Sequence, residues 1–394
     1  MMSFLHKVLA KARPTRCFGT LAGKMRTSST HKFGRVLLVG VGGTSVVVGA
    51  VTLWTKGGNS VLAASMLEGK DWMSSPITDP HEMEKNADSM RIKMEMMIMD
   101  IQREFCRALE AEEEDDMKFK VDKWSRKQGG GGITCVLQDG RVFEKAGVNI
   151  SVVSGNLPPQ AVQQMKSRGK VLEGKTLPFF ATGISSVIHP RNPNVPTVHF
   201  NYRYFEVTDE KGTKHWWFGG GTDLTPYTLD EKDVKHFHKT LKKTCDKHQS
   251  NYYPDFKNWC DEYFYIKHRG ESRGVGGIFF DDLEDGDPQE LFNFVKDCAK
   301  SVVPSYMPLV TKNKKKGYGY NERRWQLLRR GRYVEFNLVY DRGTKFGLFT
   351  PGARFESILM SLPLNASWEY CHEPEPGSEE AKLTEVLKNP RDWV

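Results

Sequence analysis

The chain has 394 residues and a formal net charge of +8. Nine of its 57 Lys and Arg residues precede Glu68, the first acidic residue, so the remainder carries 48 basic and 49 acidic side chains. This nearly neutral body gives no argument from charge for nucleic-acid binding. The seven cysteines include no C-x-x-C pair, and so they indicate no zinc site, iron–sulfur cluster or disulfide framework.

Residues 1–67 are basic and free of acidic side chains, which is typical of a mitochondrial transit peptide and excludes them from the predicted fold. Within them, residues 36–54 form an uncharged run of 19, diluted by glycine, serine and threonine. Two interpretations stay open. The run is either part of a bipartite signal that is removed on delivery to the intermembrane space, or a retained membrane anchor. The folded domain is predicted at residues 75–394.

The first predicted helix begins at Pro80, with Asp79 as its N-cap and Glu82 closing a capping box, and its methionine stripe continues to Phe105. Capping boxes also predict helices at 228–247 and from Pro288, and a further helix is predicted near 255–268. Alternating apolar residues predict strands at 118–124, 133–137, 148–153, 179–188, 197–207, 214–218, 277–280 and 332–340. Helices that follow hairpins favour an α+β fold, in which a large, mostly antiparallel sheet is flanked by helices on both faces in a single domain.

Two glycine-rich segments resemble nucleotide-binding loops. Residues 169–176 satisfy G-x-x-x-x-G-K-[ST], but a helical pattern precedes them and a strand pattern follows, which is the reverse of a phosphate-binding loop. Residues 274–277 lead into a strand, whereas a dinucleotide fingerprint opens a helix. We therefore expect neither segment to bind a nucleotide.

The strand at 197–207 carries the strongest functional pattern. Its alternation places His199, Asn201 and Arg203 on one face and aromatic or aliphatic side chains on the other. A proton-transfer group, an amide and a guanidinium in one row suit a large acidic ligand. Three glycines at 219–221 allow close approach to a ligand and deliver Asp223 after the strand at 214–218. Arg342 and Arg354 are further candidates for gripping carboxylates.

Five motifs together resemble the oxygen-dependent coproporphyrinogen III oxidase family across residues 75–394. They are Ser185-Ser-Val-Ile-His189-Pro-Arg-Asn-Pro, Pro196-Thr-Val-His199-Phe-Asn201-Tyr-Arg203, Trp216-Trp-Phe-Gly-Gly-Gly-Thr-Asp223-Leu-Thr-Pro, Arg273-Gly-Val-Gly-Gly-Ile-Phe-Phe-Asp-Asp282-Leu and Gly331-Arg-Tyr-Val-Glu-Phe-Asn. The absence of a C-x-x-x-C-x-x-C cluster argues against the oxygen-independent enzyme of the same pathway.

The resemblance implies oxidative decarboxylation of two propionates of coproporphyrinogen III to vinyl groups, with O₂ as co-substrate and no cofactor. It implies a proton-donor role for His199 and pyrrole N–H contacts for Asp223. It also implies a homodimer formed through about residues 333–369, from Tyr333 to Glu369. The implied substrate contacts are Ser185, Asn201, Tyr202, Arg203, Gly352, Ala353 and Arg354.

Two rival functions stay open. Some bacterial members of the family carry a divalent metal on histidines that match His189, His199, His238 and His268, so a histidine-metal oxygenase is the first rival, although animal-like members are considered metal-free. A non-enzymatic tetrapyrrole carrier is the second, and it would not need His199 or Asp223. The expected location is the mitochondrial intermembrane space, with possible peripheral association with the inner membrane left open.

Overall fold

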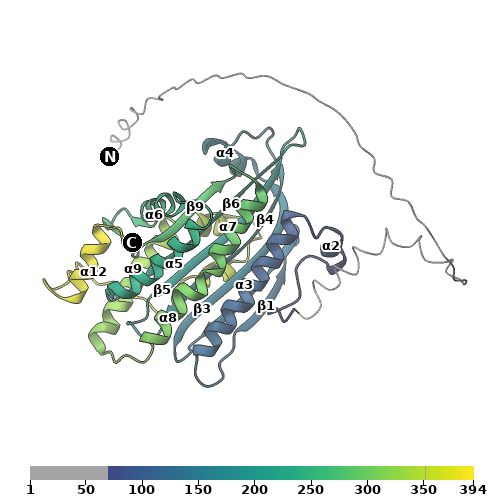
Figure 1. Ribbon diagram of the computed structural model, residues 1–394. Helices are drawn as coiled ribbons and strands as arrows, with labels where there is room; N and C mark the ends of the chain where they lie inside the picture. Colours follow the sequence, from purple (N-terminus) through teal and green to yellow (C-terminus); the bar gives the residue numbers. More distant parts are fainter. Residues whose placement is uncertain (1–69, 351) are drawn as a thin grey trace, which may run out of the picture. The chain divides into compact units, whose positions relative to one another are not determined.

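In the computed structural model, residues 70–350 and 352–394 are described, so the predicted leader at 1–67 and its hydrophobic run at 36–54 lie outside them. Their main element is a seven-stranded sheet in the order β1-β2-β3-β4-β5-β6-β9, in which every neighbouring pair is antiparallel (Figure 1). A two-stranded sheet pairs β7 with β8. The strands are β1 (Lys120–Ser125), β2 (Gly130–Gln138), β3 (Phe143–Leu157), β4 (Leu177–Pro190), β5 (Thr197–Thr208), β6 (Lys214–Thr225), β7 (Tyr265–Ile266), β8 (Glu271–Ser272) and β9 (Gly277–Leu283).

Helices cover both faces of the large sheet, which confirms the predicted α+β class. On one face Phe105 of α3 packs edge-on against Phe200 of β5, with ring centroids 5.2 Å apart, and α5, α7 and α8 lie beside α3 (Figure 1). On the opposite face Tyr333 of α9 packs against His189 of β4. The helices are α2 (Pro80–Lys85), α3 (Met90–Glu112), α4 (Pro159–Ser167), α5 (Glu231–Asp246), α6 (Tyr252–Tyr263), α7 (Pro288–Lys300), α8 (Val302–Asn313), α9 (Tyr320–Val339), α10 (Arg342–Phe349), α11 (Phe355–Leu359) and α12 (Glu379–Lys388).

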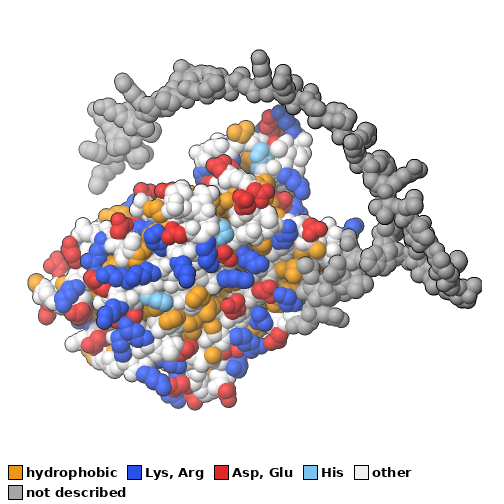
Figure 2. All heavy atoms as spheres, in the orientation of Figure 1, with side chains coloured by type: hydrophobic (Ala, Val, Ile, Leu, Met, Phe, Trp, Pro, Cys, Tyr) orange, Lys and Arg blue, Asp and Glu red, His pale blue; other side chains and the backbone are white. Residues whose placement is uncertain are grey.

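The face covered by α3, α5, α7 and α8 shows basic and acidic side chains interspersed (Figure 2), in keeping with the neutral body found in the sequence. Among the residues described, no helix is both long and apolar enough to cross a membrane.

Seven of the eight predicted strands are present, with ends shifted by up to seven residues. The eighth prediction, at 332–340, is wrong because these residues belong to helix α9. The buried apolar residues of this helix include Trp325, Leu328, Tyr333 and Phe336, a spacing of three to five that follows helical periodicity from Tyr320 onward. A window that begins at residue 332 contains too few turns to reveal this period.

Several helix boundaries also differ from the prediction. Asp79 is the N-cap of α2 as expected, but that helix ends at Lys85 and a second one begins after its own N-cap, Ser89. Asn and Ser between the two offer the backbone alternative hydrogen bonds, which favours a break. Helix α5 is capped by Asp230 rather than by Thr228, because the Asp230 carboxylate accepts from two backbone N–H groups. The predicted helix at 255–268 ends earlier, at Tyr263.

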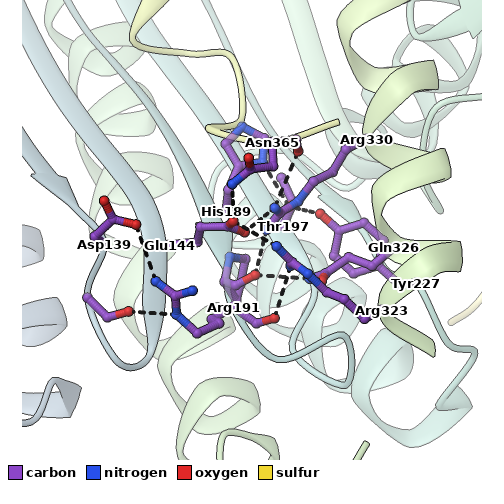
Figure 3. A network of polar contacts seen from close by, with 12 residues as sticks. Asp139, Glu144, His189, Arg191, Thr197, Tyr227, Arg323, Gln326, Arg330 and Asn365 are labelled. Atoms are coloured by element: carbon purple, nitrogen blue, oxygen red, sulfur yellow. Dashed lines mark hydrogen bonds and ion pairs between the residues drawn. The ribbon is translucent and has the colours of Figure 1, made fainter. Parts of the chain in front are cut away.

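A buried polar network fastens α9 to the sheet (Figure 3). Glu144 of β3 forms an ion pair with Arg330, and both side chains are almost completely buried. Arg323 donates to the other oxygen of Glu144 at 2.7 Å, and Asn365 donates to it at 2.6 Å. Burial alone would raise the pKa of Glu144, but the two arginines and Asn365 outweigh it and lower the pKa to about 2. The network therefore holds a charged carboxylate at neutral pH.

Candidate active site

A cavity of about 440 Å³ opens on the face of the sheet opposite α3, within the size range of small-molecule sites. His199, Asn201 and Arg203 line it from β5, and Ser185 lines it from β4. Helices α4, α6, α9, α10 and α11 contribute further lining residues. The alternation of β5 thus places His199, Asn201 and Arg203 in the same cavity, as predicted.

His199 is paired with Asp223 across two neighbouring strands. The two residues face each other in the register of β5 and β6, and His199 Nδ1 lies 2.7 Å from Asp223 Oδ1. With Nδ1 engaged by a carboxylate, Nε2 is the ring nitrogen left for a ligand in the cavity. This pairing fixes the orientation of the ring, with Nδ1 as the donor to the carboxylate.

Asp223 itself lies behind His199. Its carboxylate is 2% exposed, and among the described residues it does not belong to the cavity lining. Arg273 donates to both of its oxygens, with Nη2 at 2.9 Å from Oδ2 and 3.0 Å from Oδ1. Burial alone would raise the pKa of Asp223, but the charges of Arg273 and His199 outweigh burial and lower it. Asp223 is therefore an anionic support for the imidazole.

Arg273 is itself buried and held by aromatic rings. Its guanidinium lies 4.0 Å from the ring centroid of Phe264 and 4.5 Å from that of Tyr333. Its Nη1 donates to Asn337 Oδ1 at 2.9 Å. Stacking on rings and a carboxylate partner together compensate the guanidinium for lost water.

The three glycines before Asp223 lie inside a strand, and not after its end as predicted. Strand β6 does not end at Phe218 but continues to Thr225, so Asp223 lies inside a strand. Gly219 faces Arg203, and a Cβ at this position would lie 2.6 Å from the guanidinium. The absent side chain leaves room for Arg203 to extend across the neighbouring strand.

Arg203 and Arg342 converge on a single carboxylate. Arg203 Nη2 lies 2.8 Å from Asp281 Oδ1, and Arg342 Nη2 lies 3.2 Å from Asp281 Oδ2. Asn201 Oδ1 accepts a further hydrogen bond from Arg203 Nη1 at 2.7 Å. Because all four residues line the cavity, the two cations and their shared anion form a polar cluster in its wall.

Some predicted site residues lie elsewhere. The Tyr202 side chain is buried on the opposite face of β5, where its hydroxyl bonds to Thr222, so only its backbone faces the neighbouring strands. Gly352, Ala353 and Arg354 precede α11 and do not line this cavity in the described structure. Arg354 instead pairs with Asp122 and lines a second cavity beside β1 and β2. These four residues were predicted as substrate contacts, and none of them lines the main cavity in the described structure.

The proposed set of four metal-binding histidines does not come together. Buried His189 contacts Thr197 Oγ1 at 3.3 Å (Figure 3) and Ser361 O at 2.9 Å. Buried His238 contacts Tyr253 and the carbonyl of Val275, whereas exposed His268 contacts Tyr340 and Glu335. Burial lowers the pKa of His189 to about 3 and that of His238 to about 4. Within the described part of the chain, no three His, Cys, Asp or Glu side chains gather in a group that could hold a metal ion.

Sequence reasoning missed three residues that shape the site. Arg273, Asn337 and Asp281 appear in the sequence only as parts of motifs, yet they hold Asp223 and the cavity arginines. The available signal was chemical, because an arginine within an apolar, glycine-rich motif requires a carboxylate partner. Arg273 and Asp223 are 50 residues apart in the sequence, so no local sequence pattern predicts that they are in contact.

The fold and the cavity define an α+β protein whose small-molecule-sized cavity is lined by arginines and by a histidine paired with a carboxylate. Residues 93–393 match the family model described as coproporphyrinogen III oxidase. The chain is 62% identical to the oxygen-dependent coproporphyrinogen-III oxidase of Drosophila melanogaster, covering 95% of this chain and 97% of the relative. It is 60% identical to the mitochondrial oxygen-dependent enzyme of Homo sapiens, covering 82% and 71%. The chain belongs to the coproporphyrinogen III oxidase family.

Proposed function

We propose that this protein is an oxygen-dependent coproporphyrinogen III oxidase of haem biosynthesis. Each of two propionates, with one O₂ and one proton, becomes a vinyl group, CO₂ and hydrogen peroxide. The observation that carries the proposal is that His199, oriented by Asp223, shares a cavity with Arg203 and Arg342. A proton-transfer group and two carboxylate-binding groups thus face the same ligand.

The residues divide the work as follows. Arg203 and Arg342 hold propionates by bidentate, charge-assisted hydrogen bonds. His199 Nε2 delivers the proton that the reduced oxygen takes up, while Asp223 and Arg273 keep the imidazole in place. The position of Asp223 behind His199 supports this orienting role in preference to direct contact with pyrrole N–H groups. The electron-rich tetrapyrrole supplies the electrons to O₂, so the chemistry needs no bound cofactor.

A turnover assay tests the proposal. Purified protein is incubated aerobically with coproporphyrinogen III, and protoporphyrinogen IX and peroxide are followed with and without a chelator. We expect two equivalents of peroxide per protoporphyrinogen, with the rate unchanged by the chelator. A rate abolished by chelation and restored by one metal would favour the histidine-metal oxygenase, and bound but unchanged substrate would favour the carrier.

Arg203→Ala is expected to raise KM for coproporphyrinogen III by about 10- to 100-fold with a smaller change in kcat, because a hydrogen bond to a charged group contributes about 1.5–3 kcal/mol. Steady-state kinetics measures both constants. Arg391→Ala, which removes an exposed ion pair with Glu231, is the matched control and should leave KM within about twofold. An unchanged KM in Arg203→Ala would remove this residue from substrate binding.

We also propose a homodimer formed through about residues 333–369. Large apolar side chains are exposed along this region, among them Phe349 at 84% and Trp368 at 54%. Contiguous exposed apolar surface is typical of a protein interface.

Phe349→Glu is expected to raise the dimer dissociation constant by at least about 30-fold, as for a hot-spot residue. Sedimentation analysis measures it, with the exposed Val171→Glu outside the region as control; a monomeric wild-type protein would contradict the proposal.

For location, we propose the mitochondrial intermembrane space, with peripheral contact to the inner membrane. The acid-free leader and its uncharged run support this placement, and the human and rat relatives are named mitochondrial. Fractionation of mitochondria with and without carbonate extraction separates a peripheral protein from an anchored one.

A further inference from the structure

Strand β9 is distorted at the edge of the cavity. Phe218 of β6 pairs with Leu283 and Gly220 with Phe280, so β9 carries one extra residue between these pairs. This is a β-bulge, and Asp282 within it has φ +50, a left-handed conformation that aspartate tolerates better than most residues. Neighbouring side chains in a regular strand point to opposite faces, whereas here Asp281 and Asp282 reach the same guanidinium.

That guanidinium belongs to Arg168, the C-cap residue of α4. Its Nη2 lies 2.5 Å from Asp282 Oδ1, and its Nη1 lies 3.8 Å from Asp281 Oδ2. The side chain is 32% exposed and lines the cavity together with Arg203 and Arg342. The cavity therefore has three arginines at one end, and of their two acidic partners only Asp281 lines it.

The partners of Arg168 do not depend on it. Lys170 Nζ lies 3.5 Å from the same oxygen of Asp282, and Asp281 already has Arg203 and Arg342. Arg168 can therefore turn to another anion without leaving a buried carboxylate unpaired, which would otherwise cost several kcal/mol. A partly exposed arginine with a replaceable partner is suited to a ligand that arrives with its own carboxylate.

We propose that Arg168 binds a third carboxylate of the tetrapyrrole, exchanging Asp282 for a propionate when the substrate enters. The inference rests on the proposed function, which supplies a substrate with four propionates. Three arginines then distinguish tetrapyrroles by their number of carboxylates. The final product, which retains two propionates, can engage at most two of the three arginines, and this difference favours its release.

Binding of two porphyrins tests the inference. Dissociation constants are measured by fluorescence for coproporphyrin III, with four carboxylates, and for mesoporphyrin IX, with two. Arg168→Gln is expected to weaken coproporphyrin III binding by about 10- to 100-fold and to leave mesoporphyrin IX within about twofold. Asp282→Asn should leave coproporphyrin III binding unchanged or tighter, because it removes the competing anion. Arg141→Gln, which breaks an exposed ion pair with Asp115, is the control.

Two results would overturn it. If Arg168→Gln weakened the binding of both porphyrins equally, or did not weaken it at all, Arg168 would not bind a third carboxylate. Weakening by Asp282→Asn as large as that by Arg168→Gln would show that the ion pair only anchors α4. Turnover of coproporphyrinogen III by the wild-type protein is measured in parallel; its absence counts against the proposed function, whereas altered porphyrin selectivity in Arg168→Gln supports this inference independently.

Discussion

His199→Gln is expected to lower kcat by about 10²- to 10⁴-fold, the range for losing a positioned proton-transfer group. The amide keeps much of the shape and polarity of the imidazole, but it transfers no proton at neutral pH. Because Arg203 and Arg342 are untouched, KM should change by less than about threefold. Steady-state kinetics under saturating O₂ gives both constants.

A second histidine provides the control for this experiment. His236 is exposed on α5 and contacts the carbonyl of Pro304, on the face of the sheet opposite the cavity. His236→Gln should retain kcat within about twofold. If His199→Gln retained half of the wild-type kcat, the proton that completes the reaction would have to come from another group.

Glu144→Gln is expected to lower the free energy of unfolding by about 3–5 kcal/mol, because it leaves Arg330 and Arg323 without their buried countercharge. Urea denaturation at pH 7 measures the change. Asp115→Asn is the matched control, since its ion pair with Arg141 is exposed and should contribute less than about 1 kcal/mol. A change below about 1 kcal/mol in Glu144→Gln would show that the network does not hold α9 to the sheet.

The same carboxylate makes the effect depend on pH. The folded pKa of Glu144 is lowered from 4.5 to about 2, so its contribution is fully present above pH 4.5. As pH falls from 4.5 towards 2, the unfolded state takes up a proton that the folded state does not, and the contribution is lost. The difference in unfolding free energy between wild type and Glu144→Gln should therefore shrink through this window and stay constant above it.

Strand β5 shows how much a local pattern can predict. One of its faces is buried against α3, so the period of two is strict, and this period alone predicts that His199, Asn201 and Arg203 lie together on the other face. The sheet class follows from similar local patterns. Helix α9 was wrongly predicted as a strand, because the aromatic and β-branched residues at 333–339 resemble a strand when the preceding helical turns are ignored.

The parts of the site that were missed depend on long-range contacts. Arg273 meets Asp223 across a separation of 50 residues, and Asp281 meets Arg203 across 78. Residues so far apart in the sequence share no periodic pattern. They meet only because β9 packs beside β6 after the chain has turned back before β9. The bulge that turns Asp281 and Asp282 towards one arginine is likewise a departure from the regular strand on which the prediction relied.

A crystal structure with bound coproporphyrin III would test most directly whether the cavity at β5 is the substrate site. We expect propionate oxygens within hydrogen-bonding distance of both Arg203 and Arg342, and a further propionate side chain facing His199 Nε2. A porphyrin bound only in the second cavity, beside Arg354, with His199 and Arg203 free of contact, would contradict the account.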